Sequence, residues 1–237
     1  MPVKVEVWGD YALFTRPEMK VERVSYDIMT PSAARGLLEA IYWHPGMVWI
    51  IDRIHVCSPI CFSNLRRNEV KSTVSVHTAR TVMKRGAGEL YLNASEDIQQ
   101  RASLLLRDVR YVIEAHFDMT EKATDSDNPG KFQDIAVRRI QKGQFYHQPY
   151  LGCREFPANF RWCEELPPCP EELRGERDLG WMLWDLDYSD PANINPLFFR
   201  AVLKNGVLEV PLRNSKPANK KSSPKQDLME ENFAVSR

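Results

Sequence analysis

The sequence predicts an α+β protein: an N-terminal domain of the RRM-like (ferredoxin-like) type, followed by a smaller β-rich domain. Two observations carry this prediction. The first part of the chain shows strand, helix, strand, hairpin, helix and strand patterns in the β-α-β-β-α-β order, and the second part shows short strand patterns joined by turns. We place the domains at residues 1–122 and 123–212, and expect the polar, lysine-rich residues 213–237 to form a disordered tail.

The first strand follows from alternation at the start of the chain. Val3, Val5 and Val7 alternate with Lys4, Glu6 and Trp8, which is the period of a half-buried strand, and a second extended piece covers residues 12–15.

A helix is predicted between Thr30 and Pro45. Thr30 suits the N-cap, a proline occupies the first helical position, and Pro45 stops the helix. One face carries an apolar stripe of Ala34, Leu37, Leu38 and Ile41. Tyr42 then either completes this buried stripe or presents its hydroxyl to a substrate at the helix end.

The middle of the chain predicts two further strands and a helix. Residues 47–57 are dense in β-branched side chains and long enough for a central strand. Residues 65–97 show many charges and little periodicity, so we expect a hairpin or a mobile loop. Asp97 then caps a helix that runs to about Leu106, and residues 109–117 alternate as a strand.

The second part begins with a helix whose first turn contains proline, over residues 127–142. Its apolar stripe is Phe132, Ile135, Ala136 and Ile140, and its exposed basic residues are Lys131, Arg138 and Lys142. Lys131 lies in the first turn, where free backbone N–H groups and the helix dipole favour an anion. This lysine is therefore either a phosphate ligand or a solvated residue of the exposed face. Short strands are predicted within residues 150–162, 180–188 and 205–211.

Composition restricts the function classes. Of the 237 residues, 43% are hydrophobic and 27% are charged, which is ordinary for a globular protein, and no apolar run approaches the ~20 residues of a membrane span. The first residues show a strand pattern instead of a signal peptide. Five cysteines with no CxxC pair predict reduced thiols in a cytoplasmic protein and no metal site. The net charge of zero gives no argument for nucleic acid, so only local basic clusters do.

Several long strings resemble one known family. They are GDYALFTRPEMKVERVSYDIMTPSAARGLLEAIYWHP, IDRIHVCSPICFSNLRRNEV, VRYVIEAHF, NPGKF and YLGCREFPANF, in this order, and the likeness runs from about residue 3 to about residue 210. They are similar to the CRISPR-associated Cas family five of the type I-C subtype.

The resemblance implies an RRM-like domain followed by a smaller β-rich domain. It also implies cleavage of CRISPR precursor RNA at the base of the repeat hairpin without a metal ion or other cofactor. The expected partners are precursor and mature guide RNA and the backbone and large subunits of the type I-C surveillance complex, where the protein stays on the 5′ handle; no membrane is involved.

The family's active site is a tyrosine, a lysine and a histidine. The tyrosine matches Tyr42 in IYWHP and the lysine matches Lys131 in NPGKF, whereas the position of the histidine is occupied by Phe132. We expect Tyr42 to position the attacking 2′-hydroxyl and Lys131 to stabilise the phosphorane, and His44 is the nearest substitute for the histidine. The departure at Phe132 leaves a second hypothesis, a non-catalytic subunit that binds the 5′ handle. If the histidine is limiting, Phe132→His raises cleavage.

RNA contacts are expected from basic and aromatic side chains, because RNA readers contact phosphates with cations and stack unpaired bases on aromatic rings. The predicted phosphate contacts are Arg66, Arg67, Lys71, Arg139 and Arg154, and the predicted stacking groups are Tyr150 and Phe156.

Overall fold

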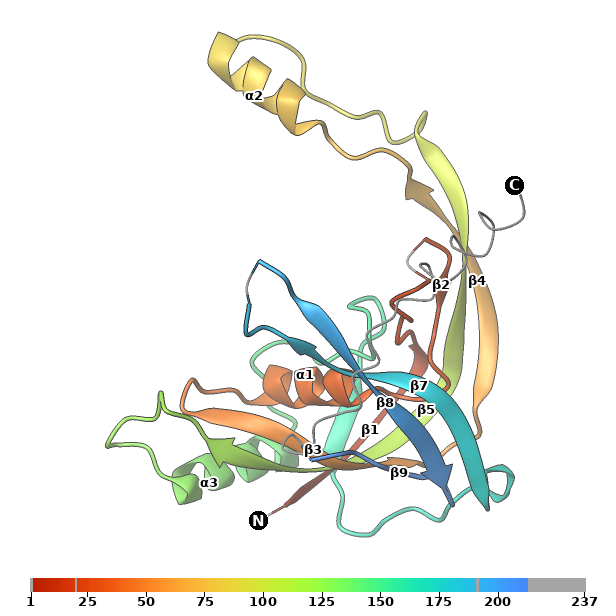
Figure 1. Cartoon of the computed structure of the whole chain (residues 1–237), viewed down its shortest axis with the longest axis vertical. Coiled ribbons are helices and arrows are strands. Elements are labelled where there is room, and N and C mark those ends of the chain that lie inside the picture. The colour runs from red at the N-terminus through yellow and green to blue at the C-terminus, as the bar shows by residue number, and fades with distance from the viewer. Residues whose placement is uncertain (1, 20, 191, 213–237) are drawn as a thin grey trace, which may run out of the picture.

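The computed structural model of the chain describes residues 2–19, 21–190 and 192–212, so the predicted tail at 213–237 lies outside the described residues. Its centre is a mostly antiparallel sheet with the strand order β6-β1-β5-β3-β9-β8-β7 (Figure 1). The first half of the sheet consists of β1 (Val3–Ala12), β3 (Met47–Val56), β5 (Ile98–Met119) and β6 (Asn159–Trp162). Among the described residues, each helix is too short or too polar to traverse a bilayer.

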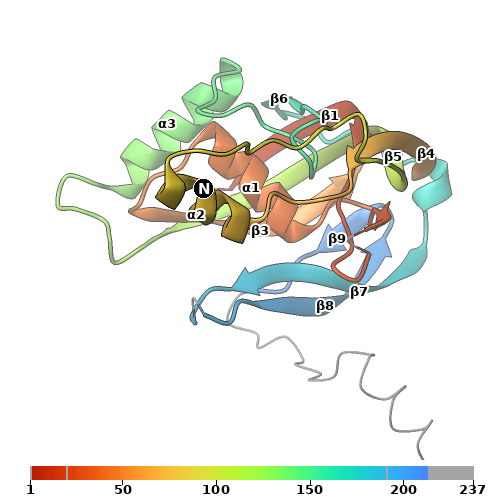
Figure 2. The same ribbon diagram turned by 90° about the horizontal axis from the view of Figure 1, so that it is seen from above.

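Two helices cover one face of this half. Helix α1 (Pro31–Ile41) packs against β3, and α3 (Pro129–Gln141) packs against β6 and α1 (Figure 2). The chain order β1-α1-β3-β5-α3-β6 and the spatial order β6-β1-β5-β3 confirm the predicted α+β fold with an RRM-like unit. Because β6 pairs with β1 across the expected boundary at residues 122 and 123, we infer that this unit extends to Trp162.

The predicted helix between Asp97 and Leu106 is wrong, because these residues belong to β5. The N-terminal part of β5 pairs with β4 (Cys61–Val70), from Val70 opposite Ile98 to Cys61 opposite Arg107. This ladder satisfies the backbone groups of a segment whose leucines and glutamines favour a helix locally. Asp97 accepts hydrogen bonds from the backbone N–H and hydroxyl of Ser72 at 2.6 and 2.9 Å, which closes the ladder instead of capping a helix.

Of the two expectations for residues 65–97, a hairpin or a mobile loop, the hairpin is observed, but its second strand lies in residues 98–107, and its connection carries a helix that the sequence did not predict. Helix α2 (Val76–Arg85) lies between β4 and β5, with Ser75 as its N-cap and Gly86 at φ 63° as its C-cap. Helix α2 has no buried residue, so its apolar side chains do not pack on a hydrophobic core. The hairpin and α2 project from the body as an arm (Figure 1).

The second half of the sheet continues from β3. It contains β7 (Glu176–Asp187), β8 (Asn195–Lys204) and β9 (Val207–Glu209), and β9 pairs with β3. The remaining short elements are β2 (Arg23–Val24), which pairs with β5, and a 3₁₀ turn at Glu171–Leu173. The strands expected within 180–188 and 205–211 are confirmed, the segment 150–162 is extended only at its end, and β8 was not predicted.

A forked ion pair holds β7 on α1. The guanidinium of Arg35 donates to both carboxylate oxygens of Asp185, one of them at 2.7 Å from Nη2. In addition, the backbone N–H of Leu183 donates to the hydroxyl of Tyr26 at 3.2 Å. The sheet therefore curls so that β3 and β7 both contact α1.

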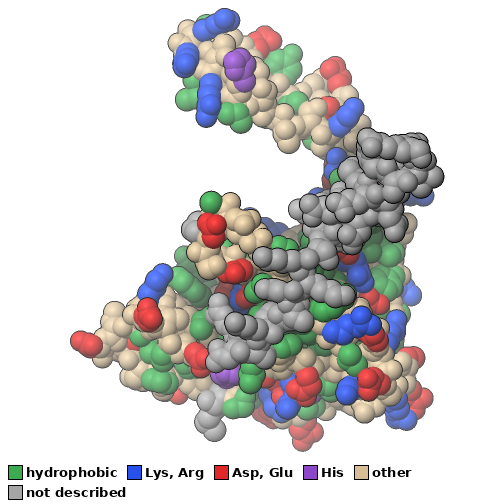
Figure 3. Space-filling model, in the orientation of Figure 1, with side chains coloured by type: hydrophobic (Ala, Val, Ile, Leu, Met, Phe, Trp, Pro, Cys, Tyr) green, Lys and Arg blue, Asp and Glu red, His purple; other side chains and the backbone are tan. Residues whose placement is uncertain are grey.

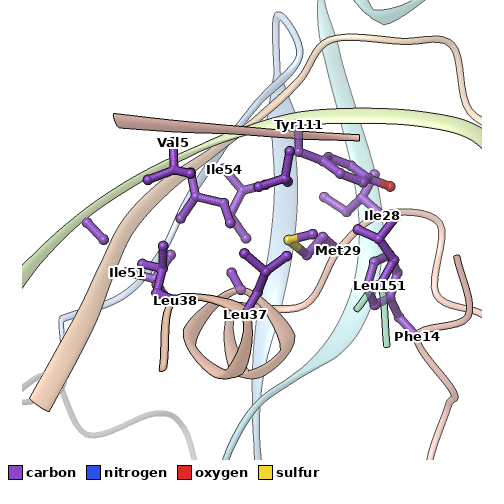
Figure 4. Packing of buried hydrophobic residues seen from close by; sticks show 14 of the residues in the cluster. Val5, Phe14, Ile28, Met29, Leu37, Leu38, Ile51, Ile54, Tyr111 and Leu151 are labelled. Atoms are coloured by element: carbon purple, nitrogen blue, oxygen red, sulfur yellow. The ribbon is translucent and has the colours of Figure 1, made fainter. Parts of the chain in front are cut away.

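The core lies between α1 and the first half of the sheet. Leu37 and Leu38 of α1 face Val5, Ile54 and Tyr111 of the strands (Figure 4). All four residues of the predicted α1 stripe are at most 2% exposed, and each large one stabilises the fold by about 1.5–3 kcal/mol. The core thus fixes the position of the C-terminal end of α1.

A buried carboxylate on the other face of the sheet makes stability depend on pH. The side chain of Glu6 is 4% exposed and accepts from Nε of Arg110 at 2.5 Å and from Nε of Arg161 at 2.6 Å. Burial by itself raises the pKa of Glu6, but the two guanidinium groups hold this pKa below its usual value of 4.5. Such a carboxylate stabilises the fold above its usual pKa, and this contribution is lost as pH falls through the lowered pKa.

We therefore expect the melting temperature to fall as pH is lowered from about 5 to about 3, and Glu6→Gln to weaken this dependence. Melting curves of both proteins across this range measure the effect. Glu176→Gln, which changes an exposed carboxylate, is the control. Equal slopes for Glu6→Gln and the wild type would contradict the assignment.

Candidate active site

Tyr42 is the C-cap of α1 and lies against α3. Its backbone N–H donates to Leu38 O at 2.9 Å, and its carbonyl accepts from Nε1 of Trp49 at 2.8 Å. The Tyr42 ring packs edge-on against Phe132, with the centroids 6.3 Å apart, and the guanidinium carbon of Arg139 lies 5.1 Å from the centre of the Tyr42 ring. The end of α1 and the face of α3 therefore hold this side chain from both sides.

The environment of Tyr42 favours its neutral form. Burial is the main cause that raises the pKa of the phenol, the Asp127 carboxylate raises it further, and Arg139 opposes both. Among the described residues, none hydrogen-bonds to the Tyr42 hydroxyl. Tyr42 thus offers a neutral hydroxyl that can orient a substrate, and it is a poor base near pH 7.

Phe132 joins the elements of the site. Its side chain is fully buried and contacts three rings, with centroid distances of 4.8 Å to His44, 6.2 Å to Phe117 and 6.3 Å to Tyr42. This confirms that Phe132 lies on the apolar face of α3, as its spacing predicts. Because Lys131 precedes it directly, the packing of Phe132 brings the Tyr42–His44 turn to the beginning of α3.

His44 is half-exposed and has a fixed orientation. Its Nδ1 accepts the backbone N–H of Gly46 at 3.1 Å, so in the neutral ring Nε2 carries the proton. A Cβ added at Gly46 would lie 3.2 Å from this Nδ1 and 3.0 Å from Cα of Ala123. Glycine at position 46 therefore permits the close approach that fixes the orientation of the His44 ring.

Lys131 lies in the first turn of α3. Its backbone N–H donates to Oδ1 of the N-cap Asn128 at 2.8 Å, and its Nζ lies 3.4 Å from Oδ1 of Asp127 and 3.5 Å from the carbonyl of Ser126. The Lys131 side chain is 47% exposed, so the ammonium can reach a phosphate in solvent. The observed position matches the expected exposed face of the helix.

Asp127 is a site residue that sequence reasoning treated only as part of the helix start. Hydrogen bonds from the backbone N–H and hydroxyl of Thr124, together with Lys131, hold the pKa of this carboxyl below its usual value. The charge of His44 also lowers it, and the Asp127 charge in turn raises the pKa of Tyr42. An aspartate four residues before Lys131 was the available signal.

The burial of Phe132 alters the expectation for Phe132→His. A histidine there would place a polar ring in an apolar contact, so we expect the free energy of unfolding to fall by about 1–3 kcal/mol and cleavage not to rise. Thermal unfolding and cleavage of repeat RNA measure the two effects, and Phe132→Leu, which keeps the site apolar, is the control. Faster cleavage by Phe132→His would show that this position can hold a catalytic group.

The predicted RNA contacts fall into two separate places. Arg139 belongs to the Tyr42 site, where its Nη1 also donates to Ile41 O at 2.8 Å. Arg66, Arg67 and Lys71 lie on or directly after β4, at the opposite end of the molecule from α3 (Figures 1 and 2). Figure 3 shows further Lys and Arg side chains on the arm that begins there.

Not all of these predicted contacts are free for RNA. The guanidinium of Arg67 pairs with Glu155, whereas Arg66, Lys71 and Arg154 are exposed. Tyr150 is exposed, but Phe156 packs in the core beside Tyr11, with ring centroids 6.2 Å apart, so the expectation that Phe156 stacks a base is wrong. Within the described ranges, no group of three or more His, Cys, Asp or Glu side chains is arranged to hold a metal ion.

Comparison with known proteins relates this chain to one family. A family model described as CRISPR-associated protein (Cas5), of the Cas5d type, matches residues 3–211. A relative from Mannheimia succiniciproducens is 50% identical over 214 residues, which cover 88% of this chain and 94% of that protein. A relative from Thermus thermophilus is 42% identical over 228 residues, covering 88% and 91%. Both relatives are named CRISPR pre-crRNA endoribonuclease Cas5d.

Solved structures share the fold. A CRISPR-associated protein matches with a TM-score of 0.65 and 25% identity over 91% of this chain and 94% of that chain. A functionally uncharacterized protein from Streptococcus mutans matches with a TM-score of 0.64 at 22% identity, covering 91% and 95%. A chain of a CRISPR RNA-guided surveillance complex matches with a TM-score of 0.52 at 13% identity, covering 98% of each chain. With the family match over residues 3–211 and two relatives above 40% identity, the chain belongs to the Cas5d family of CRISPR-associated proteins.

Proposed function

We propose that this chain is an endoribonuclease that cleaves CRISPR precursor RNA at the base of the repeat hairpin without a metal ion. The observation that supports this best is the packing of Tyr42 and His44 on Phe132, the residue that follows Lys131 in α3. The names of the two relatives support the same activity.

In the proposed reaction, the 2′-hydroxyl attacks the adjacent phosphorus, and the bond to the 5′-oxygen breaks. The products are a 2′,3′-cyclic phosphate and a 5′-hydroxyl. Tyr42, as a neutral phenol, orients the 2′-hydroxyl, and Lys131 stabilises the extra negative charge of the phosphorane. In this step His44 acts as the imidazolium: its Nε2 proton passes to the leaving 5′-oxygen, while Nδ1 carries the second proton and no longer accepts from Gly46.

These roles leave the proton of the 2′-hydroxyl to be accepted by solvent. The phenol of Tyr42 stays protonated near pH 7 because burial raises its pKa, so it does not accept this proton. His44 as acid and Lys131 as cation still lower the activation barrier of RNA cleavage without a strong base, because each proton transfer contributes separately to the rate.

After cleavage, we propose that the protein stays on the 5′ handle of the guide RNA in the cytoplasm, as a subunit of the type I-C surveillance complex. Its protein partners would be the backbone and large subunits. The fold that it shares with a chain of a surveillance complex supports a place in such an assembly.

The test incubates the purified protein with its own repeat RNA in EDTA and determines the RNA ends by mass spectrometry. We expect a cyclic phosphate and a 5′-hydroxyl, and no product from RNA with a 2′-deoxy nucleotide at the cut site. Uncut RNA that nevertheless binds tightly would favour the non-catalytic handle-binding subunit, for which the burial of Phe132 in the histidine position is the supporting observation.

A further inference from the structure

A set of exposed aromatic side chains surrounds the end of α1 and has no role in the proposed reaction. Tyr146 is 75% exposed and Trp43 is 57% exposed, and Phe145, which precedes Tyr146, is also exposed. Single exposed aromatic residues are common, but several near one candidate site indicate a binding surface.

Hydrogen bonds fix the loop that carries Tyr146. The backbone N–H groups of Tyr146 and His147 both donate to the carbonyl of Ala40 at 3.0 Å, and that of Gln144 donates to Arg139 O at 2.9 Å. Since Trp43 follows Ala40 by three residues, its backbone lies within about 11 Å of this anchor. Tyr146 is therefore held beside the turn that contains Tyr42.

The segment that leads to Tyr146 carries a basic excess, which favours an anion. Residues 129–147 contain four basic residues and one acidic residue, and the basic ones are Lys131, Arg138, Arg139 and Lys142. Arg138 and Lys142 are exposed, and neither forms an ion pair with any described residue. Exposed aromatic rings beside unneutralised cations are the combination that binds single-stranded nucleic acid, because bases stack on the rings and phosphates contact the cations.

We propose that Tyr146 and Trp43 form a platform on which an unpaired base of the precursor RNA stacks next to the scissile phosphate, with Arg138 and Lys142 contacting the flanking phosphates. The platform rests on the proposed function, because it places the nucleotide beside the Tyr42–Lys131 site. It would act on RNA binding and register, and the chemical step would remain with Tyr42, His44 and Lys131.

The test compares Tyr146→Ala, Tyr146→Phe and the wild type with repeat RNA that carries a 2′-deoxy nucleotide at the cut site, so that binding is measured without cleavage. We expect Tyr146→Ala to raise the dissociation constant about 10-fold and Tyr146→Phe, which keeps the ring, to change it less than about 2-fold. Tyr188→Ala removes an exposed tyrosine from the end of β7 and is the matched control. With cleavable RNA, Tyr146→Ala should raise the half-saturating protein concentration by a similar factor and leave the saturated rate nearly unchanged.

Equal affinities of Tyr146→Ala and the wild type would overturn the platform, as would a loss that Tyr146→Phe does not rescue or that Tyr188→Ala shares. If Tyr146→Ala instead impaired subunit assembly with RNA affinity intact, the surface would be a protein contact and the proposal would be wrong. A wild type that binds this RNA but does not cut normal repeat RNA would contradict the proposed function, and the affinity series would still decide the platform.

Discussion

Lys131→Ala is expected to lower the single-turnover rate of RNA cleavage by about 10²–10³-fold, which is the usual cost of removing one preorganised group that stabilises a transition-state charge. Lys131 is the exposed cation in the first turn of α3, where the helix dipole adds to its attraction for the phosphorane. Rates are measured with saturating protein, so that RNA affinity does not enter.

The fold should tolerate this substitution. A partly exposed ion pair such as Lys131–Asp127 contributes little to stability, so the melting temperature should stay close to that of the wild type. Lys204→Ala removes an exposed lysine that pairs with Glu176 at 3.6 Å, far from the site along the chain, and should leave the rate unchanged. A Lys131→Ala rate within a few-fold of the wild type would remove Lys131 from the active site.

His44→Ala is expected to lower the saturated rate by about 10²–10⁴-fold, because it removes the only proposed proton donor to the 5′-oxygen. With Nδ1 facing Gly46, Nε2 is the ring nitrogen left for the RNA, and it donates its proton when the ring is an imidazolium, with Nδ1 also protonated. His77→Ala, which changes an exposed histidine of α2, is the control.

A modified substrate separates proton donation from other roles of His44. In RNA with sulfur in place of the bridging 5′-oxygen, the leaving thiolate has a pKa of about 8.5 and needs no proton. We therefore expect His44→Ala to cleave this RNA nearly as fast as the wild type. A defect of equal size with both substrates would show that His44 acts in another way, such as holding Phe132 and Tyr42 in place.

Helices α1 and α3 could be predicted because their signals are local. A capping side chain, a proline in the first turn and an apolar stripe lie within a few residues of each other, and the Thr30 and Asn128 caps are both observed. The same local reasoning failed for residues 97–106, where pairing with β4 outweighs the helical preference of the segment. It also missed α2, whose few apolar residues face no core.

The sequence by itself proposed the first candidates for the site: Tyr42 at a helix end, Lys131 in a first helical turn, and Phe132 at the position where the resemblance implies a histidine. Only the tertiary structure decided the surroundings of each residue. The packing of α1 on α3 buries Phe132, raises the pKa of Tyr42 and places Arg139 over its ring, while Gly46 orients His44 and Asp127 holds Lys131. Burial, pKa and hydrogen-bond direction depend on neighbours far apart in sequence, so local patterns propose candidate residues but do not give their states.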